Sequence, residues 1–356
     1  MATEQTNGLA TAVEKDDLVI PLIDFSRYLH GTPSEKAAIG NAMAHGFKTA
    51  GFIYLQNHGI PSDTVENVFA QSAQFFARPQ EQKDKLSWTT PQSNRGYVVM
   101  GREKVSRLTT KEDVEKMRGS NPDLKESFEI GREDTPGFKN NWPTSPDPAD
   151  TTFTQTMQSF FLTAKALHIN VMRAIALGMN LPETYFDAYT SAGDNNLRLL
   201  HYPPVKKSVF EQNKGQVRAG DHTDYGSVTL LFQDMRGGLQ VLSPQGTWVN
   251  ATPIPGTIVI NAGDLLARWS NDIIKSTNHR VIEPPLPPSA GAGGEEGLQQ
   301  QEGDQVYPAR YSVAYFCNPN FESDIEALPG TWEKSGKKYE KINSYDYLVQ
   351  RLSATY

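Results

Sequence analysis

The segment Gly220–Gly226 contains an imidazole and a carboxylate, His222 and Asp224, separated by a single residue. In an extended backbone, side chains two residues apart point to the same side, so these two groups can aim at one point. His279 is the third candidate ligand. Two imidazoles and one carboxylate on one face of a metal leave three coordination positions open, which is the arrangement of non-haem Fe(II) sites. A His-x-Asp pair also occurs by chance in solvated surface turns, so the metal hypothesis needs support from the rest of the chain.

A strand-like run, Arg310–Phe316, supplies a second chemical group. By the two-residue period, Arg310 and Ser312 share one face of this strand with Phe316. Both faces of the strand are too apolar for solvent, so Arg310 is expected to be buried and to need an anionic partner. The guanidinium fork suits a carboxylate, and the Ser312 hydroxyl can bond the same oxygens. An ordinary ion pair with an acidic residue of the core is the alternative explanation.

The run Arg198–Pro204 predicts another strand, on which Arg198 and Tyr202 share a face. Tyr202 can donate a hydrogen bond to a carboxylate, and Arg198 can donate to a carbonyl or amide. The alternatives are that Tyr202 is an amphipathic residue at a rim and that Arg198 is a surface charge or pairs with a carboxylate such as Asp194.

The hydrophobic periodicity predicts the elements that position these groups. A capping box at Thr32–Glu35, with a proline at the first helical position, begins a helix that ends before Gly51. An apolar stripe at helical spacing predicts a long helix from Phe153 to Gly178 that packs against a sheet. The other predicted elements are a short edge strand at 19–23 interrupted by Pro21, a strand at 51–55, a helix from Ser62 to before Pro79, and a final helix capped by Ser344.

After Asn196 the apolar spacing shifts toward the two-residue period, with Gly, Pro and Asn between the runs, which predicts a β-rich sandwich or jelly roll. These runs are Leu197–Leu200, Val228–Phe232, Leu239–Leu242, Thr257–Ile260 and Tyr311–Phe316. The stretch from Trp88 to Trp142 is mixed and predicts no clear element. The low-complexity segment 284–304 predicts a mobile loop, either a lid or a disordered insertion.

The composition narrows the class of partner. The 356 residues carry a formal charge of −7, which gives no basic surface for nucleic acid. Cys317 is the single cysteine, so a disulfide within the chain is impossible, in agreement with a reducing, cytoplasmic compartment. No apolar run reaches the length that a membrane span needs, and the polar N-terminus lacks a secretory signal. A small free substrate is expected, with no membrane and no obligatory protein partner.

The ordered motifs of the chain resemble those of a known family. His222-x-Asp224, His279 and Arg310-x-Ser312, in that order, are similar to the isopenicillin N synthase-like family of 2-oxoglutarate/Fe(II)-dependent dioxygenases. The N-terminal part is also similar to that family, in the motifs Ile20–Asp24, Gly51–Tyr54, Asn57–Ile60 and Asn94–Tyr97. The resemblance covers nearly the whole chain.

This resemblance implies a mainly β fold with flanking helices and a double-stranded β-helix (jelly-roll) core. It implies Fe(II) as the metal, 2-oxoglutarate as co-substrate, O₂ as oxidant and ascorbate as an auxiliary reductant. The implied iron ligands are His222, Asp224 and His279, and the implied 2-oxoglutarate ligands are Arg310, Ser312 and Tyr202. No catalytic side chain is expected beyond these ligands.

The family layout divides the chain into five regions. They are a flexible N-terminal tail (1–17), an N-terminal non-haem dioxygenase region (18–145), a long support helix (146–190), the dioxygenase core with the loop 284–304 (191–320), and a C-terminal extension with a helix (321–356).

Within the family, four stretches are similar to the fungal enzymes that hydroxylate thymine: 197–203, 217–220, 261–272 and 314–319. The implied reaction converts the thymine methyl group to a hydroxymethyl group and oxidises it further. A planar pyrimidine would then stack on Phe316, accept a hydrogen bond from Arg198, and gain an edge contact or a hydrogen bond from Tyr225. The alternatives are a fungal metabolite-tailoring oxygenase, an isopenicillin N synthase-like oxidase without 2-oxoglutarate, a non-catalytic binding barrel, and a zinc hydrolase.

Overall fold

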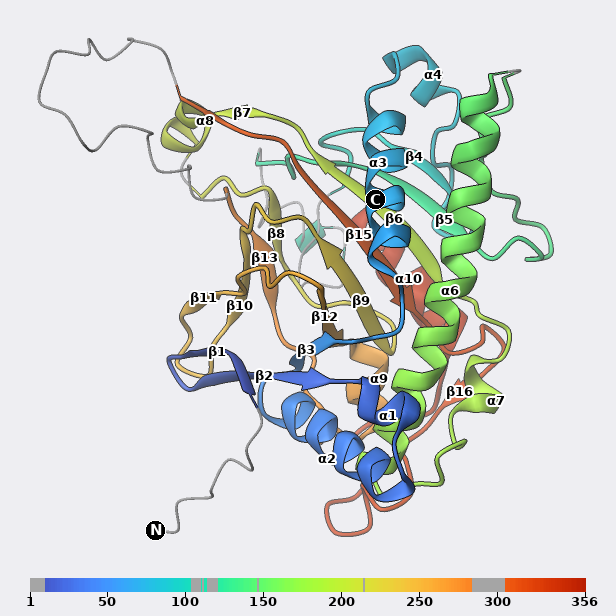
Figure 1. The fold of residues 1–356 in the computed structure, drawn as a ribbon, viewed down its shortest axis with the longest axis vertical. Helices are drawn as coiled ribbons and strands as arrows, with labels where there is room; N and C mark the ends of the chain where they lie inside the picture. Colours follow the sequence, from blue (N-terminus) through green and yellow to red (C-terminus); the bar gives the residue numbers. More distant parts are fainter. Residues whose placement is uncertain are drawn as a thin grey trace, which may run out of the picture.

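The computed structural model describes residues 10–103, 110, 112–113, 121–145, 147–213, 215–283 and 305–356, so the loop predicted at 284–304 lies outside the described residues. Two β-sheets occupy the centre of the molecule, and helices cover one side of the larger sheet (Figure 1). The helices are α1 (Ser26–His30), α2 (Pro33–Thr49), α3 (Ser62–Phe76), α4 (Gln80–Asp84), α6 (Pro148–Gly178), α7 (Asp187–Thr190), α8 (Lys207–Gln212), α9 (Asp264–Trp269) and α10 (Ser344–Thr355).

Among the described residues, the large sheet has nine strands in the order β1-β2-β3-β12-β9-β15-β6-β5-β4, and the small sheet has four in the order β11-β10-β13-β8. Two short ribbons pair β7 with β14 and β16 with β17. The strands are β1 (Ala10–Lys15), β2 (Leu18–Asp24), β3 (Phe52–Gln56), β4 (Gly96–Val98), β5 (Glu126–Gly131), β6 (Asn196–Tyr202), β7 (Val205–Lys206), β8 (Ala219–His222), β9 (Val228–Gln233), β10 (Leu239–Leu242), β11 (Trp248–Asn250), β12 (Thr257–Ala262), β13 (His279–Val281), β14 (Val306–Tyr307), β15 (Arg310–Cys317), β16 (Asp324–Ile325) and β17 (Ile342–Asn343).

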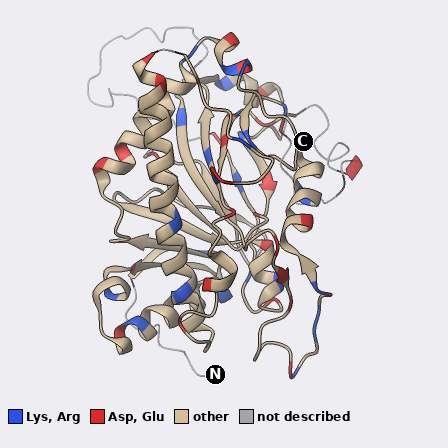
Figure 2. Ribbon diagram, turned by 90° about the vertical axis from the view of Figure 1, so that its right-hand side faces the viewer, with Lys and Arg blue, Asp and Glu red and all other residues tan. Residues whose placement is uncertain are grey.

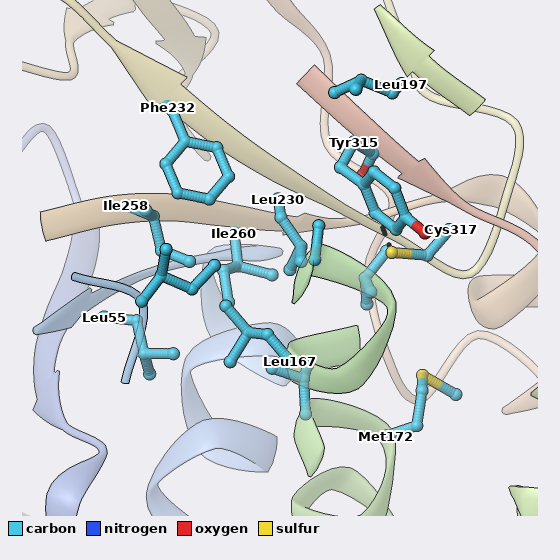
Figure 3. Close-up of a cluster of buried hydrophobic side chains, with 14 of the residues drawn as sticks. Leu55, Leu167, Met172, Leu197, Leu230, Phe232, Ile258, Ile260, Tyr315 and Cys317 are labelled. Atoms are coloured by element: carbon cyan, nitrogen blue, oxygen red, sulfur yellow. Dashed lines mark hydrogen bonds between the residues drawn. The ribbon is translucent and has the colours of Figure 1, made fainter. Parts of the chain in front are cut away.

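The central strands of the large sheet are buried on both faces. One face packs on α6, and Figure 3 shows Phe232, Ile260 and Tyr315 from three neighbouring strands gathered with Leu167 of that helix. The alternate residues of the same strands, such as Ala314, pack with side chains of the small sheet. This face-to-face packing confirms the predicted double-stranded β-helix core.

Helix α6 supports the sheet along its length and packs on α2 and α3. A side chain at Gly40 would place its Cβ 2.6 Å from the Ala174 carbonyl oxygen, and one at Gly178 would lie 2.1 Å from the Gly40 carbonyl oxygen. These two glycines therefore permit the close approach of α2 and α6. In the described part of the chain, α6 alone has the length and apolar character of a membrane span, but more than half of its apolar window is buried inside the fold, as in a core helix.

Most elements predicted from periodicity are confirmed, including the capping box that begins α2 and the end of α6 at Gly178. The prediction of a flexible tail over 1–17 is wrong for Ala10–Lys15, which forms β1 and pairs with β2. The β1 side chains are mostly exposed, so their sequence carries no apolar alternation that would have revealed the strand.

Two smaller predictions are also wrong. The strand containing Pro21 is not at the edge, because β1 pairs with it through an irregular register next to Thr11. Helix α10 is capped by Asn343, whose side chain accepts hydrogen bonds from the Tyr345 and Asp346 amides, whereas Ser344 is its first residue.

Candidate metal centre and flanking cavities

Two histidines and one carboxylate meet where the small sheet faces the large one. His222 of β8 and His279 of β13 are direct cross-strand partners, so their rings lie on the same face, with centroids 4.4 Å apart. The Nε2 atoms of His222 and His279 lie 3.7 and 3.8 Å from Oδ1 of Asp224. All three ligand atoms lie within 4.8 Å of one another, so one metal ion can contact them together.

Hydrogen bonds orient both imidazoles. Nδ1 of His222 lies 2.8 Å from the Gly220 carbonyl oxygen, and Nδ1 of His279 lies 3.3 Å from the Thr277 carbonyl oxygen. A carbonyl oxygen only accepts, so each Nδ1 carries the hydrogen and each Nε2 lone pair points to the centre of the cluster.

The Asp224 carboxylate is held from the large sheet. Its Oδ2 accepts hydrogen bonds from Thr229 Oγ1 at 2.5 Å and Asn261 Nδ2 at 2.7 Å. Thr229 and Asn261 are cross-strand partners on β9 and β12, on the face opposite to α6. Since Oδ2 is occupied, Oδ1 is the atom that remains for a metal.

The protonation states suit metal binding. Burial, reinforced by His279, lowers the pKa of His222 to about 3, so its imidazole is neutral at physiological pH. Burial alone would raise the pKa of Asp224, but the two histidines and the bonds from Thr229 and Asn261 hold it below its usual value. A neutral imidazole and an ionised carboxylate are the forms that bind a divalent cation, so the donor set fits Fe(II).

A cavity of about 70 Å³ extends from the metal ligands to Arg310 and Ser312. Arg310 is 1% exposed, and its Nε and Nη1 donate to the Gly237 carbonyl oxygen and to Ser312 Oγ at 2.8 and 3.2 Å. The Arg310 guanidinium lies 4.9 Å from the centre of the Tyr202 ring, which lines the same cavity.

Arg310 and its buried neighbour Arg218 have no carboxylate within ion-pair distance in the part of the chain that the structure describes. Burial and the nearby Arg310 charge together lower the pKa of Arg218. This end of the cavity therefore favours an anionic ligand. The alternative of an ordinary core ion pair for Arg310 is wrong within the described residues.

A second cavity, of about 50 Å³, also borders the ligands His222 and Asp224. Phe316, Arg198 and Tyr225, the three predicted substrate residues, all line it, together with Leu348 and Leu352 of α10. Phe316 and Arg198 also line the first cavity, so the two cavities share these walls as well as the ligands His222 and Asp224.

Arg198 is buried in a group of charged side chains, which excludes the surface-charge alternative. Its Nη1 and Nε lie 2.9 and 2.7 Å from carboxylate oxygens of Glu103 and Glu129, and its Nη2 donates to the Tyr356 hydroxyl at 3.1 Å. Lys125 also pairs with Glu103. Arg198 does not pair with Asp194, which is bound by Arg132 instead. Figure 2 shows basic residues on strands in the interior of the molecule as well as on the outer helices.

Sequence reasoning missed several residues that surround the metal ligands. Thr229 and Asn261 were given no role at the metal site, because a polar residue on a strand is common and Asn261 was noted only as part of the similar stretch 261–272. Glu103 and Lys125 belong to the stretch that predicted no element. Asn196 lines the second cavity, and the two-residue period through Arg198 could have identified it.

Asp264 connects both ligand-bearing loops. Its Oδ2 accepts hydrogen bonds from Thr223, which lies between two ligands, and from Arg351 of α10. Its Oδ1 accepts from Ser276, three residues before His279.

A wider surface groove of about 580 Å³ touches Asp264, but neither ligand histidine lines it, so the chemistry belongs to the smaller cavities.

Two family models match separate regions of the chain. The model for the N-terminal region of a non-haem dioxygenase in morphine synthesis matches residues 20–145, and the model for the 2OG-Fe(II) oxygenase superfamily matches residues 193–319. The 2-oxoglutarate-Fe(II) type oxidoreductase ppzD of Metarhizium rileyi is 33% identical over 340 residues, covering 94% of this chain and 90% of that protein.

Two crystal structures of Neurospora crassa thymine 7-hydroxylase are more similar. The complex with alpha-KG and thymine is 58% identical, with a TM-score of 0.86, and covers 98% of this chain and 100% of that chain. The complex with alpha-KG and 5-formyluracil is 55% identical, with a TM-score of 0.84, and covers 97% of this chain and 99% of that chain.

We expect that replacing His222, Asp224 or His279 with Ala abolishes turnover and greatly weakens binding of Fe(II), because two ligands cannot hold the ion in this geometry. Calorimetric titration with Mn(II) as a redox-inert probe measures the binding directly. His45→Ala, an exposed histidine on α2, is the matched control. Full metal affinity in His279→Ala would remove that residue from the ligand set.

Thr229→Val should weaken metal binding about tenfold, because it removes the hydroxyl that fixes Asp224 while keeping the shape of the side chain. The same Mn(II) titration measures this loss, and thermal unfolding reports whether the strand itself is disturbed. An unchanged affinity in a well-folded variant would show that Asn261 alone is sufficient to orient the carboxylate.

Proposed function

The chain belongs to the 2-oxoglutarate- and Fe(II)-dependent oxygenase superfamily, and from this premise we propose that it hydroxylates the 5-methyl group of thymine. Family membership itself makes the protein a 2-oxoglutarate-dependent dioxygenase that acts on a small molecule. Family membership also favours a reaction that consumes 2-oxoglutarate over the alternative of an isopenicillin N synthase-like oxidase, which does not use it. The identity of the small molecule is the proposal.

In the proposed reaction, thymine, 2-oxoglutarate and O₂ are converted to 5-hydroxymethyluracil, succinate and CO₂. Bound Fe(II) and 2-oxoglutarate supply the activation of O₂, with one oxygen atom entering the methyl C–H bond and the other entering succinate. The side chains of the protein would bind and orient the two organic molecules in the two cavities that His222 and Asp224 border.

On the co-substrate side, Arg310 and Ser312 would hold the carboxylate of 2-oxoglutarate that is distant from the metal. Their guanidinium and hydroxyl groups lie 3.2 Å apart, so both can reach the oxygens of one carboxylate. Tyr202 would donate to the same group from the cavity wall. The lack of an acidic partner for Arg310 among the described residues supports this role.

The observation that carries the substrate proposal is the composition of the second cavity. Phe316 is partly exposed there, and the guanidinium carbon of Arg198 lies 5.0 Å from the centre of its ring. Nη1 and Nη2 of Arg198 each donate one hydrogen bond, to Glu103 and to the Tyr356 hydroxyl. Each of these nitrogens carries a second N–H that can donate to a carbonyl oxygen of the substrate.

Tyr225 borders the same cavity, and its hydroxyl lies 2.6 Å from Thr355 Oγ1. The Tyr225 ring is therefore fixed beside the metal ligands and offers an edge contact more readily than a free hydroxyl. An aromatic surface and a donor of hydrogen bonds suit a planar base with carbonyl groups.

Similarity to Neurospora crassa thymine 7-hydroxylase, which was crystallised with thymine and with 5-formyluracil, supports both thymine and successive oxidation. The alternative is a fungal metabolite-tailoring oxygenase, because curated relatives at about 30% identity include a proline hydroxylase and other fungal oxygenases. Succinate formation measured across a panel of thymine, uracil, proline and small cyclic metabolites separates the two.

Arg310→Lys should raise the 2-oxoglutarate concentration needed for half-maximal turnover by about 10- to 100-fold, because Lys keeps the charge but loses the fork. Steady-state succinate formation at saturating thymine gives this value. Arg173→Lys, at the half-exposed pair with Asp187, is the matched control. An effect on thymine alone, with the 2-oxoglutarate requirement unchanged, would contradict the role of Arg310.

Thymine should stimulate succinate formation by the wild-type protein and yield 5-hydroxymethyluracil, identified by mass spectrometry. Phe316→Leu should lower kcat/KM for thymine about tenfold or more, since stacking of a base on an aromatic ring contributes ~1–3 kcal/mol. Succinate formation without thymine should stay unchanged. Phe69→Leu on α3 controls for a general loss of packing.

The assay also defines how the proposal fails. A well-folded protein that consumes 2-oxoglutarate with another member of the panel, but leaves thymine unchanged, would eliminate the thymine assignment and leave the dioxygenase activity standing.

A further inference from the structure

Asn196 begins the β6 face that continues through Arg198 toward Tyr202, and it lines the substrate-side cavity. Its cross-strand partner on β15 is Phe316. The residue is 5% exposed, so its amide is removed from solvent. None of the roles assigned above uses this amide.

The orientation of the Asn196 amide is fixed by its surroundings. Nδ2 donates a hydrogen bond to the Asn94 carbonyl oxygen at 3.1 Å. Turning the amide over would bring two oxygens together, so Oδ1 must be the atom that points away from Asn94. Oδ1 is buried and has no hydrogen-bond partner among the described residues.

A buried acceptor without a partner lowers the stability of the fold unless a ligand donates to it. The neighbouring groups indicate what such a ligand carries. Arg198 supplies donors two residues along the same strand face, and Phe316 supplies an aromatic surface opposite Asn196. An acceptor and a donor beside one aromatic ring match the adjacent N–H and C=O groups of a cyclic lactam or imide.

We propose that Asn196 Oδ1 accepts a hydrogen bond from a ring N–H of the substrate and thereby selects planar lactams and imides. The inference rests on the proposed function and adds a specificity residue to it. Asn196 accepts the hydrogen bond from the ring N–H group, whereas Arg198 donates a hydrogen bond to the neighbouring carbonyl oxygen.

A cycle of protein and ligand changes tests the inference by binding instead of turnover. Thymine, 1-methylthymine and 3-methylthymine are titrated into the Mn(II)- and 2-oxoglutarate-loaded protein under anaerobic conditions, with wild type and Asn196→Ala compared by calorimetry. Asn67→Ala, an exposed asparagine on α3, is the control for the substitution itself. The affinity for 2-oxoglutarate is measured in each variant to confirm an intact site.

In wild type, methylation of the nitrogen that faces Asn196 should weaken binding at least about tenfold, because the hydrogen bond is lost and Oδ1 stays buried without a partner. In Asn196→Ala, thymine should bind at least about tenfold more weakly, and the penalty for methylating that same nitrogen should fall to roughly threefold or less. Methylation of the other nitrogen should carry the same penalty in both proteins. Asn67→Ala should reproduce wild type.

Equal penalties for both methylated ligands in wild type and Asn196→Ala would overturn the inference, even where thymine binds and is hydroxylated. A wild-type protein that binds none of the three ligands would overturn the proposed function and this inference together. The two failures are therefore distinguishable.

Discussion

The buried Asp224 carboxylate joins the two sheets of this protein through its two oxygen atoms. Oδ1 faces the histidines of the small sheet at 3.7 and 3.8 Å, and Oδ2 accepts hydrogen bonds from Thr229 and Asn261 of the large sheet. A carboxylate removed from water destabilises the fold unless hydrogen-bond donors or positive charges contact both of its oxygen atoms. The register of β9, β12, β8 and β13 is therefore a requirement of the metal site as well as of the core.

The buried arginines divide the interior into two chemical environments. Arg198 has acidic partners, and although burial alone would raise the pKa of Glu103, Arg198 and Lys125 hold it at about 2. Arg310 and Arg218 have no such partner in the described part of the chain. The Arg310 end of the first cavity therefore suits an anionic ligand, whereas the charge of Arg198 is already balanced by Glu103 and Glu129.

Local spacing was sufficient to predict the groups that lie on one strand or helix. Arg310, Ser312 and Phe316 share a face as the two-residue period requires, and α2 begins at its capping box. The sequence could not predict contacts that depend on register between distant strands, such as Thr229 beside Asn261.

The sequence also could not predict which acidic residues pair with the buried Arg198. The acids that bind Arg198 come from the segment around Glu103 and from β5, where no clear period exists. Strand β1 escaped prediction because its pairing stabilises backbone groups and buries little apolar surface. In each case the missing information is the position of a distant segment, which local spacing does not contain.

The anchoring of Asp264 makes the C-terminal helix part of the site. Its carboxylate is shared by Thr223 and Ser276, from the two ligand loops, and by Arg351 of α10. Leu352, next to Arg351, lines the second cavity, which Tyr225 and Phe316 also line. A displacement of α10 would therefore alter that wall and the carboxylate that steadies both ligand loops. The Asp264 carboxylate therefore links the helix that forms this wall to the two segments that carry the metal ligands.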